Sequence, residues 1–237
     1  MEDFASQVTG VASLAEPVRR ELYLYVLAQE GAVSRDQAAA GIGVERHIAK
    51  FHLDRLVRDG LLDAESRRLG DRQGPGAGRP TKLYRRSARE VSVALPERRY
   101  DLAGELLARA IDDSVRDGTP VLAALGRAAS DAGALLAASA TDPSVAASTT
   151  ADDDPAPPTA LDRACRALAS RGYEPHLRDG TITMANCPFH ALARDHTELV
   201  CGMNLSLIGA LTEGLGDRLE ARLDPAPDRC CVVISQR

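Results

Sequence analysis

A tight turn, Gly41-Ile42-Gly43, separates two segments that have the apolar periodicity of helices. Before the turn, Ser34 has the position of an N-cap for a short helix that ends at Ala40. After the turn, one face of a longer helix is expected to carry the apolar residues Ile48, Phe51, Leu53, Leu56 and Val57. A short helix, a glycine turn and a longer basic amphipathic helix follow one another in the order of a helix-turn-helix.

The flanking segments complete the pattern of a winged helix-turn-helix domain. An apolar stripe over residues 14–29 predicts a preceding helix. Two short strands, over residues 61–67 and 83–85, are expected on either side of a loop rich in Gly, Pro and Arg. This loop and its strands predict a wing, and residues 1–95 are expected to form the DNA-binding domain.

Charge is distributed unevenly along the chain. The net charge of −5 argues by itself against nucleic acid, but residues 44–89 contain 12 Lys and Arg against 6 Asp and Glu, whereas residues 101–237 contain 12 against 20. A local basic patch can bind phosphates whatever the net charge. The residues expected to contact DNA lie on the longer helix and the wing: Arg46, His47, Lys50, Arg55, Arg67, Arg68, Arg72, Arg79 and Lys82.

Residues 14–86 resemble the ArsR-like winged-helix regulators. HLDRLVRDGLL is similar to the recognition-helix phrase of that family, and GRPTKLYR is similar to the second wing strand of one of its branches. The resemblance implies sequence-specific binding of a double-stranded DNA operator. The same residues also fit an ordinary solvated amphipathic helix followed by a charged loop.

The rest of the chain divides into three parts, which makes the expected fold class α+β. Residues 96–138 predict two helices, split near Gly118, that act as a spacer and as the dimerisation element of a homodimer. Residues 139–159 lack large apolar side chains, which is typical of a flexible linker. Residues 160–237 predict a small α+β sensor domain: a helix, a hairpin, a helix over 196–215 and two short strands. No run of about 18 apolar residues is found, which predicts a cytoplasmic protein with no membrane segment.

Four of the five cysteines lie beyond residue 186. In a cytoplasmic protein they are expected to be reduced thiols or metal ligands rather than disulfides. The spacing of Cys187, Cys201 and Cys230 matches no compact zinc or ferredoxin motif. The residues alone therefore leave three possibilities open: metal binding, a thiol redox switch, and buried thiols in a domain that binds an organic effector. Cys165 is expected to be a structural residue on a helix.

NCPFHALARDHTELVCGMN and the late Cys-Cys pair resemble the C-terminal domain of SufR-type repressors of iron–sulfur cluster assembly. The resemblance covers residues 160–233 and implies a [4Fe–4S] cluster held by Cys187, Cys201 and Cys230. His190 is the candidate fourth ligand, and His196, Asp195, Glu198 and Cys231 could also take that place. Because neighbouring side chains on a strand face opposite sides, Cys231 is expected to be a core residue.

The expected function is DNA binding, by a repressor, under the control of the cluster. The alternative is a winged-helix regulator that responds to an organic effector or to thiol redox state and holds no cluster. An enzyme with Cys187 as nucleophile and His190 as base is not expected, because neither an orienting third group nor an oxyanion element is found in the sequence.

Overall fold

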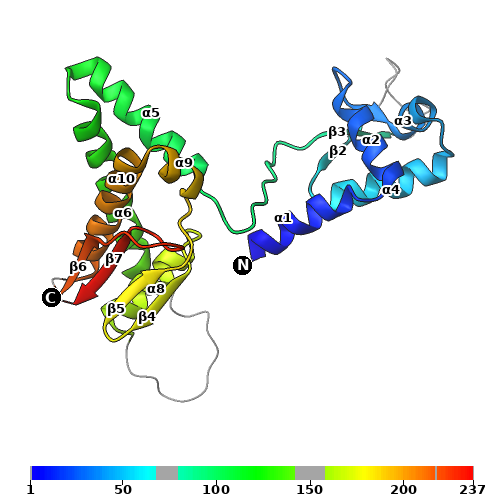
Figure 1. Ribbon diagram of the computed structural model, residues 1–237. Helices are drawn as coiled ribbons and strands as arrows, with labels where there is room; N and C mark the ends of the chain where they lie inside the picture. Colours follow the sequence, from blue (N-terminus) through cyan, green and yellow to red (C-terminus); the bar gives the residue numbers. More distant parts are fainter. Residues whose placement is uncertain (1, 68–79, 142–157, 217, 237) are drawn as a thin grey trace. The chain divides into compact units, whose positions relative to one another are not determined.

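The computed structural model describes residues 2–67, 80–141, 158–216 and 218–236. The chain is an α+β protein with two small antiparallel sheets, which confirms the predicted fold class. It divides into two compact units, Met1–Val93 (unit 1) and Ala94–Arg237 (unit 2), each with its own hydrophobic core (Figure 1). The wing-loop residues Arg68, Arg72 and Arg79 and most of the predicted linker lie outside the described residues.

Unit 1 contains four helices and a three-stranded sheet among its described residues. Ser34 is the N-cap of its third helix, as predicted. Its hydroxyl accepts a hydrogen bond from the Gln37 N–H at 3.2 Å, and the Gln37 side chain accepts one from the Ser34 N–H at 2.8 Å. The elements are α1 (Glu2–Ser13), α2 (Pro17–Leu27), β1 (Val33–Ser34), α3 (Arg35–Ile42), α4 (Arg46–Arg58), β2 (Leu62–Arg67) and β3 (Thr81–Arg86).

The end of α3 differs from the predicted one, because α3 continues through Gly41 to Ile42. Gly43, with a φ of 73°, ends the helix in the left-handed conformation that glycine adopts most easily. Gly41 has a packing role instead, since a Cβ atom there would lie 2.0 Å from Cε2 of Tyr25. Of the two glycines in the predicted turn, Gly43 therefore makes the turn, and Gly41 allows α2 and α3 to pack closely.

Helix α4 packs on the core of unit 1 through Ala49, Leu53 and Leu56, each of which is fully buried. The prediction that Phe51 also belongs to this apolar face is wrong, because its side chain is 66% exposed. Successive helical residues are about 100° apart, so Phe51 lies on nearly the opposite side of the helix from Leu53. Only one of these two residues can face the core.

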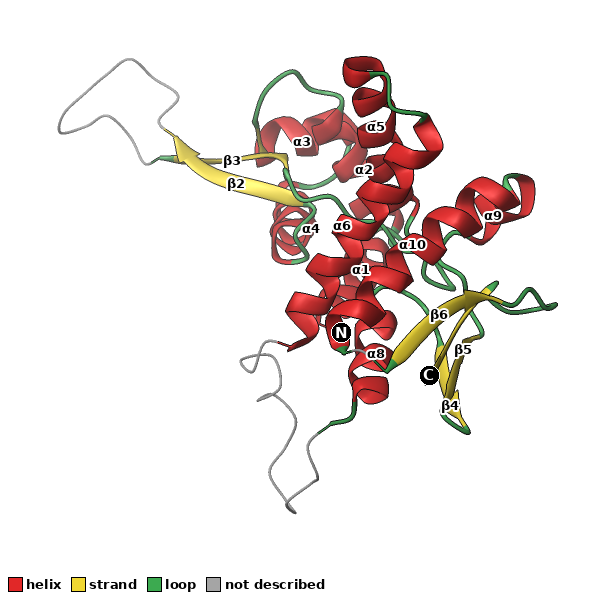
Figure 2. Ribbon diagram, turned by 90° about the vertical axis from the view of Figure 1, so that its left-hand side faces the viewer, coloured by secondary structure: helices red, strands yellow, loops and turns green. Residues whose placement is uncertain are grey.

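The sheet of unit 1 has the strand order β1-β3-β2, and both pairings are antiparallel. Val33 lies opposite Tyr84, and β2 and β3 pair along their whole length from Leu62–Arg86 to Arg67–Thr81. Figure 2 shows β2 and β3 as a two-stranded arm that extends past the helices of unit 1. Both strands were predicted from the sequence.

Unit 2 combines helices with a four-stranded antiparallel sheet of order β4-β5-β7-β6. Helices α8 and α10 cover one face of the sheet (Figure 1). The hairpin between β4 and β5 turns at Asp179 and Gly180, both with positive φ, as a tight hairpin turn requires. The elements are α5 (Tyr100–Asp117), α6 (Val121–Thr141), α8 (Ala160–Ala169), β4 (Pro175–Arg178), β5 (Thr181–Met184), α9 (His190–Asp195), α10 (Thr197–Leu215), β6 (Leu219–Leu223) and β7 (Val232–Gln236).

Helices α5 and α6 differ from the separate spacer expected over residues 96–138. Ala110 of α5 and Leu125 of α6 share one core with Ile208 of α10 and Ile234 of β7. Their apolar stripes are completed by the helix and sheet that follow in the sequence, so these helices are part of unit 2. The described part of the predicted linker begins as the last turn of α6.

Helices α6 and α10 pack closely against each other and cross at Gly133. A Cβ atom at Gly133 would lie 2.0 Å from the backbone oxygen of Leu207, so only glycine fits at this crossing. Among the described helices, α6 is the one long and apolar enough to span a membrane by length and composition, a property that it shares with core helices of soluble proteins. The sequence-based search predicted no such segment, but the stretch contains only two charged residues, Arg127 and Asp131.

Candidate nucleic-acid interface and cysteine site

The solvent side of α4 carries Arg46, His47 and Lys50, three of the nine residues predicted to contact DNA. Arg46 and Lys50 are more than half exposed, and His47 is exposed as well. Arg46 pairs with Asp36 of α3, and Lys50 pairs with Asp54 at 3.3 Å. Both cations are exposed, and ion pairs made by exposed cations contribute little to stability, so both can exchange their partner for a phosphate.

Asp54 connects α4 to strand β3. Its carboxylate accepts hydrogen bonds from Lys82 Nζ at 2.6 Å and from the Tyr84 hydroxyl at 2.9 Å. Partial burial alone would raise the pKa of Asp54, but the hydrogen bonds from Lys82, Tyr84 and Lys50 lower it below the ordinary value. Lys82 also lies 5.2 Å from the centre of the Tyr84 ring. The basic side of α4 and the base of the two-stranded arm therefore form one rigid surface.

Two more of the predicted DNA-contacting residues have different surroundings. The Arg55 guanidinium is held at 2.9 Å by the carboxylate of Asp59, which is buried, so Arg55 also has a structural contact. Arg67 is exposed at the outer end of β2, opposite Thr81. Arg67 therefore places one positive charge at the outer end of the arm.

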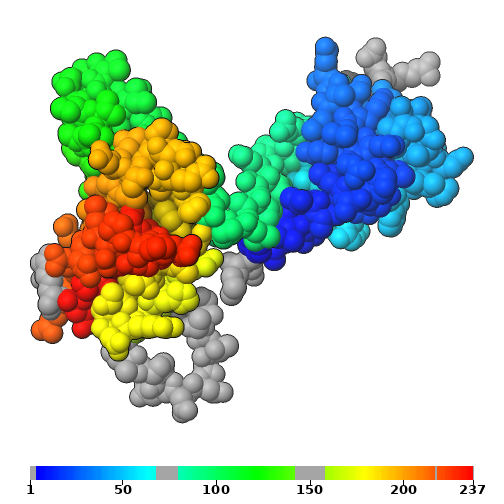
Figure 3. Space-filling model, in the orientation of Figure 1, coloured from blue at the N-terminus to red at the C-terminus, as the bar shows by residue number. Residues whose placement is uncertain are grey.

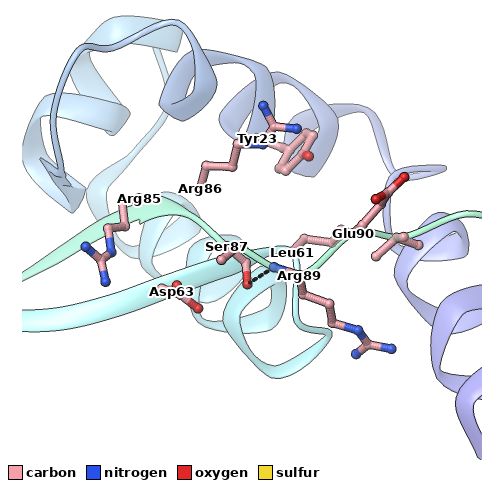
Figure 4. Close-up of a pocket in the computed structure, with 10 residues that line it drawn as sticks. Tyr23, Leu61, Asp63, Arg85, Arg86, Ser87, Arg89 and Glu90 are labelled. Atoms are coloured by element: carbon pink, nitrogen blue, oxygen red, sulfur yellow. Dashed lines mark hydrogen bonds between the residues drawn. The ribbon is translucent and has the colours of Figure 1, made fainter. Parts of the chain in front are cut away.

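Three further arginines were not singled out from the sequence: Arg85 and Arg86 at the end of β3, and Arg89 just after it. They line a cavity of about 800 Å³ with Tyr23 and Asp63. Figure 4 shows Arg86 reaching toward Tyr23, whereas the guanidinium groups of Arg85 and Arg89 point in different directions. The three cations do not converge on one point, so they extend the basic surface without forming a defined anion site. The run Tyr84-Arg85-Arg86 was the sequence signal that could have indicated this extension of the basic surface.

Unit 2 brings together four cysteines from three separate segments. Cys187 follows β5, Cys201 lies on α10, and Cys230 and Cys231 directly precede β7. All are free thiols, and Cys187, Cys201 and Cys230 are buried. Cys187 and Cys231 both hydrogen-bond to Cys230, and Cys231 also hydrogen-bonds to Cys201. This convergence could not be deduced from the cysteine spacing.

The sulfur of Cys230 is the acceptor of this cluster of thiols. Hydrogen bonds from Cys187 and then Cys231 lower the pKa of Cys230, and the Asn204 amide donates a further hydrogen bond to its sulfur at 3.3 Å. Hydrogen bonding to Cys230, together with burial, raises the pKa of both Cys187 and Cys231. The arrangement therefore favours one thiolate, Cys230, surrounded by donors.

Asn204 and Tyr173 form a buried polar layer behind Cys230. The Tyr173 hydroxyl donates a hydrogen bond to the Asn204 side-chain oxygen, which orients the amide N–H toward the sulfur. Burial and the neighbouring cysteines raise the pKa of Tyr173 well above its ordinary value, so it remains a donor. Sequence analysis missed both residues, although Asn204 was visible as a polar residue in an otherwise apolar helix.

The Cys187 loop is held by the segment that follows unit 1. The Arg98 guanidinium donates hydrogen bonds to the Cys187 carbonyl oxygen at 2.9 Å and to the Asn186 side chain. The Asn186 amide donates in turn to the backbone oxygens of Glu97 at 3.1 Å and Gly172 at 2.6 Å. The Arg99 N–H donates to the Pro188 oxygen at 3.1 Å. The backbone around Cys187 is thus fixed before any ligand binds.

The structure places Cys231 beside Cys230 and leaves His190 exposed. Cys231 was predicted to face away from Cys230 as a strand residue, but both cysteines precede β7 and the alternation of a strand does not apply to them. His190 is exposed at the start of α9, and its backbone N–H donates to the Cys187 carbonyl oxygen. Asp195, His196 and Glu198 are exposed as well. Cys165 lies on α8, where burial and Asp162 raise its pKa.

No protein-family model, curated protein or solved structure matches this chain. Within the described ranges, no three His, Cys, Asp or Glu side chains are arranged to hold a metal ion directly. The thiols contact one another instead.

Proposed function

We propose that the chain is a transcriptional repressor in which unit 1 is a winged helix-turn-helix domain and unit 2 controls DNA binding through its cysteines. The observation that carries the proposal is the continuous basic surface of α4 and β3, joined through Asp54. A helix exposing Arg46, His47 and Lys50 has the dimensions and donors needed in the major groove. The arm formed by β2 and β3 would then contact phosphates or the minor groove.

The cysteine site supports a role in sensing. Thiolates are the ligands that iron–sulfur clusters require, and buried N–H donors to the sulfurs tune cluster potential. The four convergent thiols and the Asn204 donor therefore fit a [4Fe–4S] group held by Cys187, Cys201, Cys230 and Cys231. When bound, the cluster would supply a centre that oxidants can alter. The hydrogen-bonded thiols would have to separate to admit it, which makes the local structure dependent on occupancy.

A homodimer is part of the proposal, because operators read by helix-turn-helix proteins have two half-sites. The α5–α6 connection projects from unit 2, in green in Figures 1 and 3. Ile111, Val115 and Leu122 near this connection are 52%, 83% and 68% exposed. A second copy of the chain is the partner that would cover this apolar tip. Val115→Glu is expected to halve the mass measured by light scattering, whereas Glu105→Lys, at an exposed position on the same helix, is expected to leave it unchanged.

The proposal is tested by anaerobic purification followed by iron and sulfide analysis and by DNA selection from randomised duplexes. Wild type is expected to contain about four irons per chain and to enrich one operator. The Arg46→Ala/His47→Ala/Lys50→Ala variant should lose enrichment, and Arg194→Ala in unit 2 should retain it. Enrichment of no sequence by wild type would overturn the DNA-binding function. Iron-free wild type that binds its operator equally well before and after oxidation would overturn the sensing role.

A cluster-free thiol switch is the second candidate, favoured by the direct contact between Cys187 and Cys230. Two thiols would lose two electrons and two protons to hydrogen peroxide, forming a disulfide and two waters. Intact-mass analysis distinguishes the candidates. A loss of two mass units, together with released operator, in iron-free protein would favour the thiol switch.

A further inference from the structure

Phe51 is a large apolar side chain on the solvent side of α4 that no other described residue covers. It is 66% exposed, and its only described ring contact is with His52, at 5.2 Å between ring centres. The core side of α4 is complete without it, because Ala49, Leu53 and Leu56 are fully buried. Folding of unit 1 therefore does not explain a phenylalanine at this position.

The neighbours of Phe51 indicate what would cover it. His47 lies one helical turn before it and Arg58 two turns after it, and both are exposed. Lys50, which is more than half exposed, borders the same side. A protein partner would have to remove water from this group of cations, which is unfavourable. The phosphates of a DNA duplex would instead neutralise the cations, and the groove between the phosphates also contains apolar groups.

We propose that Phe51 determines sequence specificity by packing on the C5-methyl group of a thymine in the major groove. This inference rests on the proposed DNA-binding function. The thymine methyl is the main apolar feature of the major groove, and a phenylalanine side chain is able to contact it. His47 and Lys50 would then hydrogen-bond to adjacent base edges or phosphates, while Phe51 fixes the position of one A·T pair.

The test uses the full chain and the operator that wild type enriches from randomised duplexes. Each thymine in that operator is replaced singly by deoxyuridine, which removes only the methyl group, and binding is measured by fluorescence anisotropy. At one thymine in each half-site, deoxyuridine is expected to weaken binding by wild type roughly fourfold, the effect of about one buried methyl group. Phe51→Ala is expected to show no further loss at that thymine, because the contact is already absent.

Two controls separate this contact from other effects. Leu24, which is 56% exposed on α2, provides Leu24→Ala as a matched apolar deletion that should keep the wild-type response to deoxyuridine. Phe51→Leu should keep part of it. The inference fails if wild type binds its operator but Phe51→Ala and wild type respond alike at every thymine, or if Phe51→Ala changes only the oligomeric mass. Absence of any enriched operator is a separate result, which overturns the proposed function itself.

Discussion

Cys231 lies beside Cys230 and Cys201, and it precedes strand β7, so the alternation of a strand does not turn its side chain away. Its thiol hydrogen-bonds to both Cys230 and Cys201, so it connects the two sides of the site. A side chain placed in this way shares the surroundings of the three cysteines that the sequence indicated. The fourth thiol is therefore the best candidate for the fourth ligand, ahead of the exposed His190.

Cys231→Ser is expected to lower the iron content of anaerobically purified protein by at least half, because a hydroxyl is a poorer ligand for iron–sulfur clusters than a thiolate. Cys165→Ser is the matched control, since Cys165 lies on α8 and has no part in the thiol contacts. Iron analysis and the visible spectrum measure both variants. Full iron content in Cys231→Ser would show that the fourth ligand lies elsewhere.

At the crossing of α6 and α10, Gly133 lies against the backbone of Leu207. Gly133→Ala is expected to destabilise the protein by roughly 1–3 kcal/mol or more, because a backbone atom cannot move aside as a side chain can. Gly104→Ala on α5, where a Cβ atom meets nothing within 4 Å, is expected to be neutral or to stabilise by up to about 1 kcal/mol. Urea unfolding measures both. Equal effects would contradict the proposed close packing.

Elements could be predicted where a local signal was strong. The N-cap Ser34 and strand β2 were placed correctly, because capping and the residues that bound a strand are local signals. The exposure of Phe51 was not predicted, since periodicity alone does not say which of two adjacent apolar positions faces the core. Likewise, the inclusion of α5 and α6 in the core of unit 2 and the convergence of Cys187 with Cys230 depend on contacts between distant segments.

At the scale of the whole molecule, the proposed control requires the cysteine site to be connected to the DNA-binding unit. We propose that the segment Glu97–Arg99 carries this connection, because it holds the Cys187 loop within unit 2 by hydrogen bonds and follows closely after the end of unit 1 at Val93. Under the proposal, a change at the thiols would alter this segment, which lies a few residues after the chain leaves unit 1. Control of this kind requires the segment Glu97–Arg99 to have two arrangements. The state of the thiols and the binding of DNA would each favour one of them, which is what allosteric coupling between two sites requires.

Arg98→Ala is therefore expected to uncouple the two units, because it removes both side-chain hydrogen bonds to the Cys187 loop. Arg99→Ala is the control, since its side chain hydrogen-bonds to Asp101 and its backbone N–H to Pro188 remains. Operator affinity is measured by anisotropy before and after oxidation of each protein. In Arg98→Ala the ratio of the two affinities should approach one while iron content stays near that of wild type, whereas Arg99→Ala should keep the wild-type ratio. A normal ratio in Arg98→Ala would place the connection in another segment, and a loss of iron would assign Arg98 to assembly of the site.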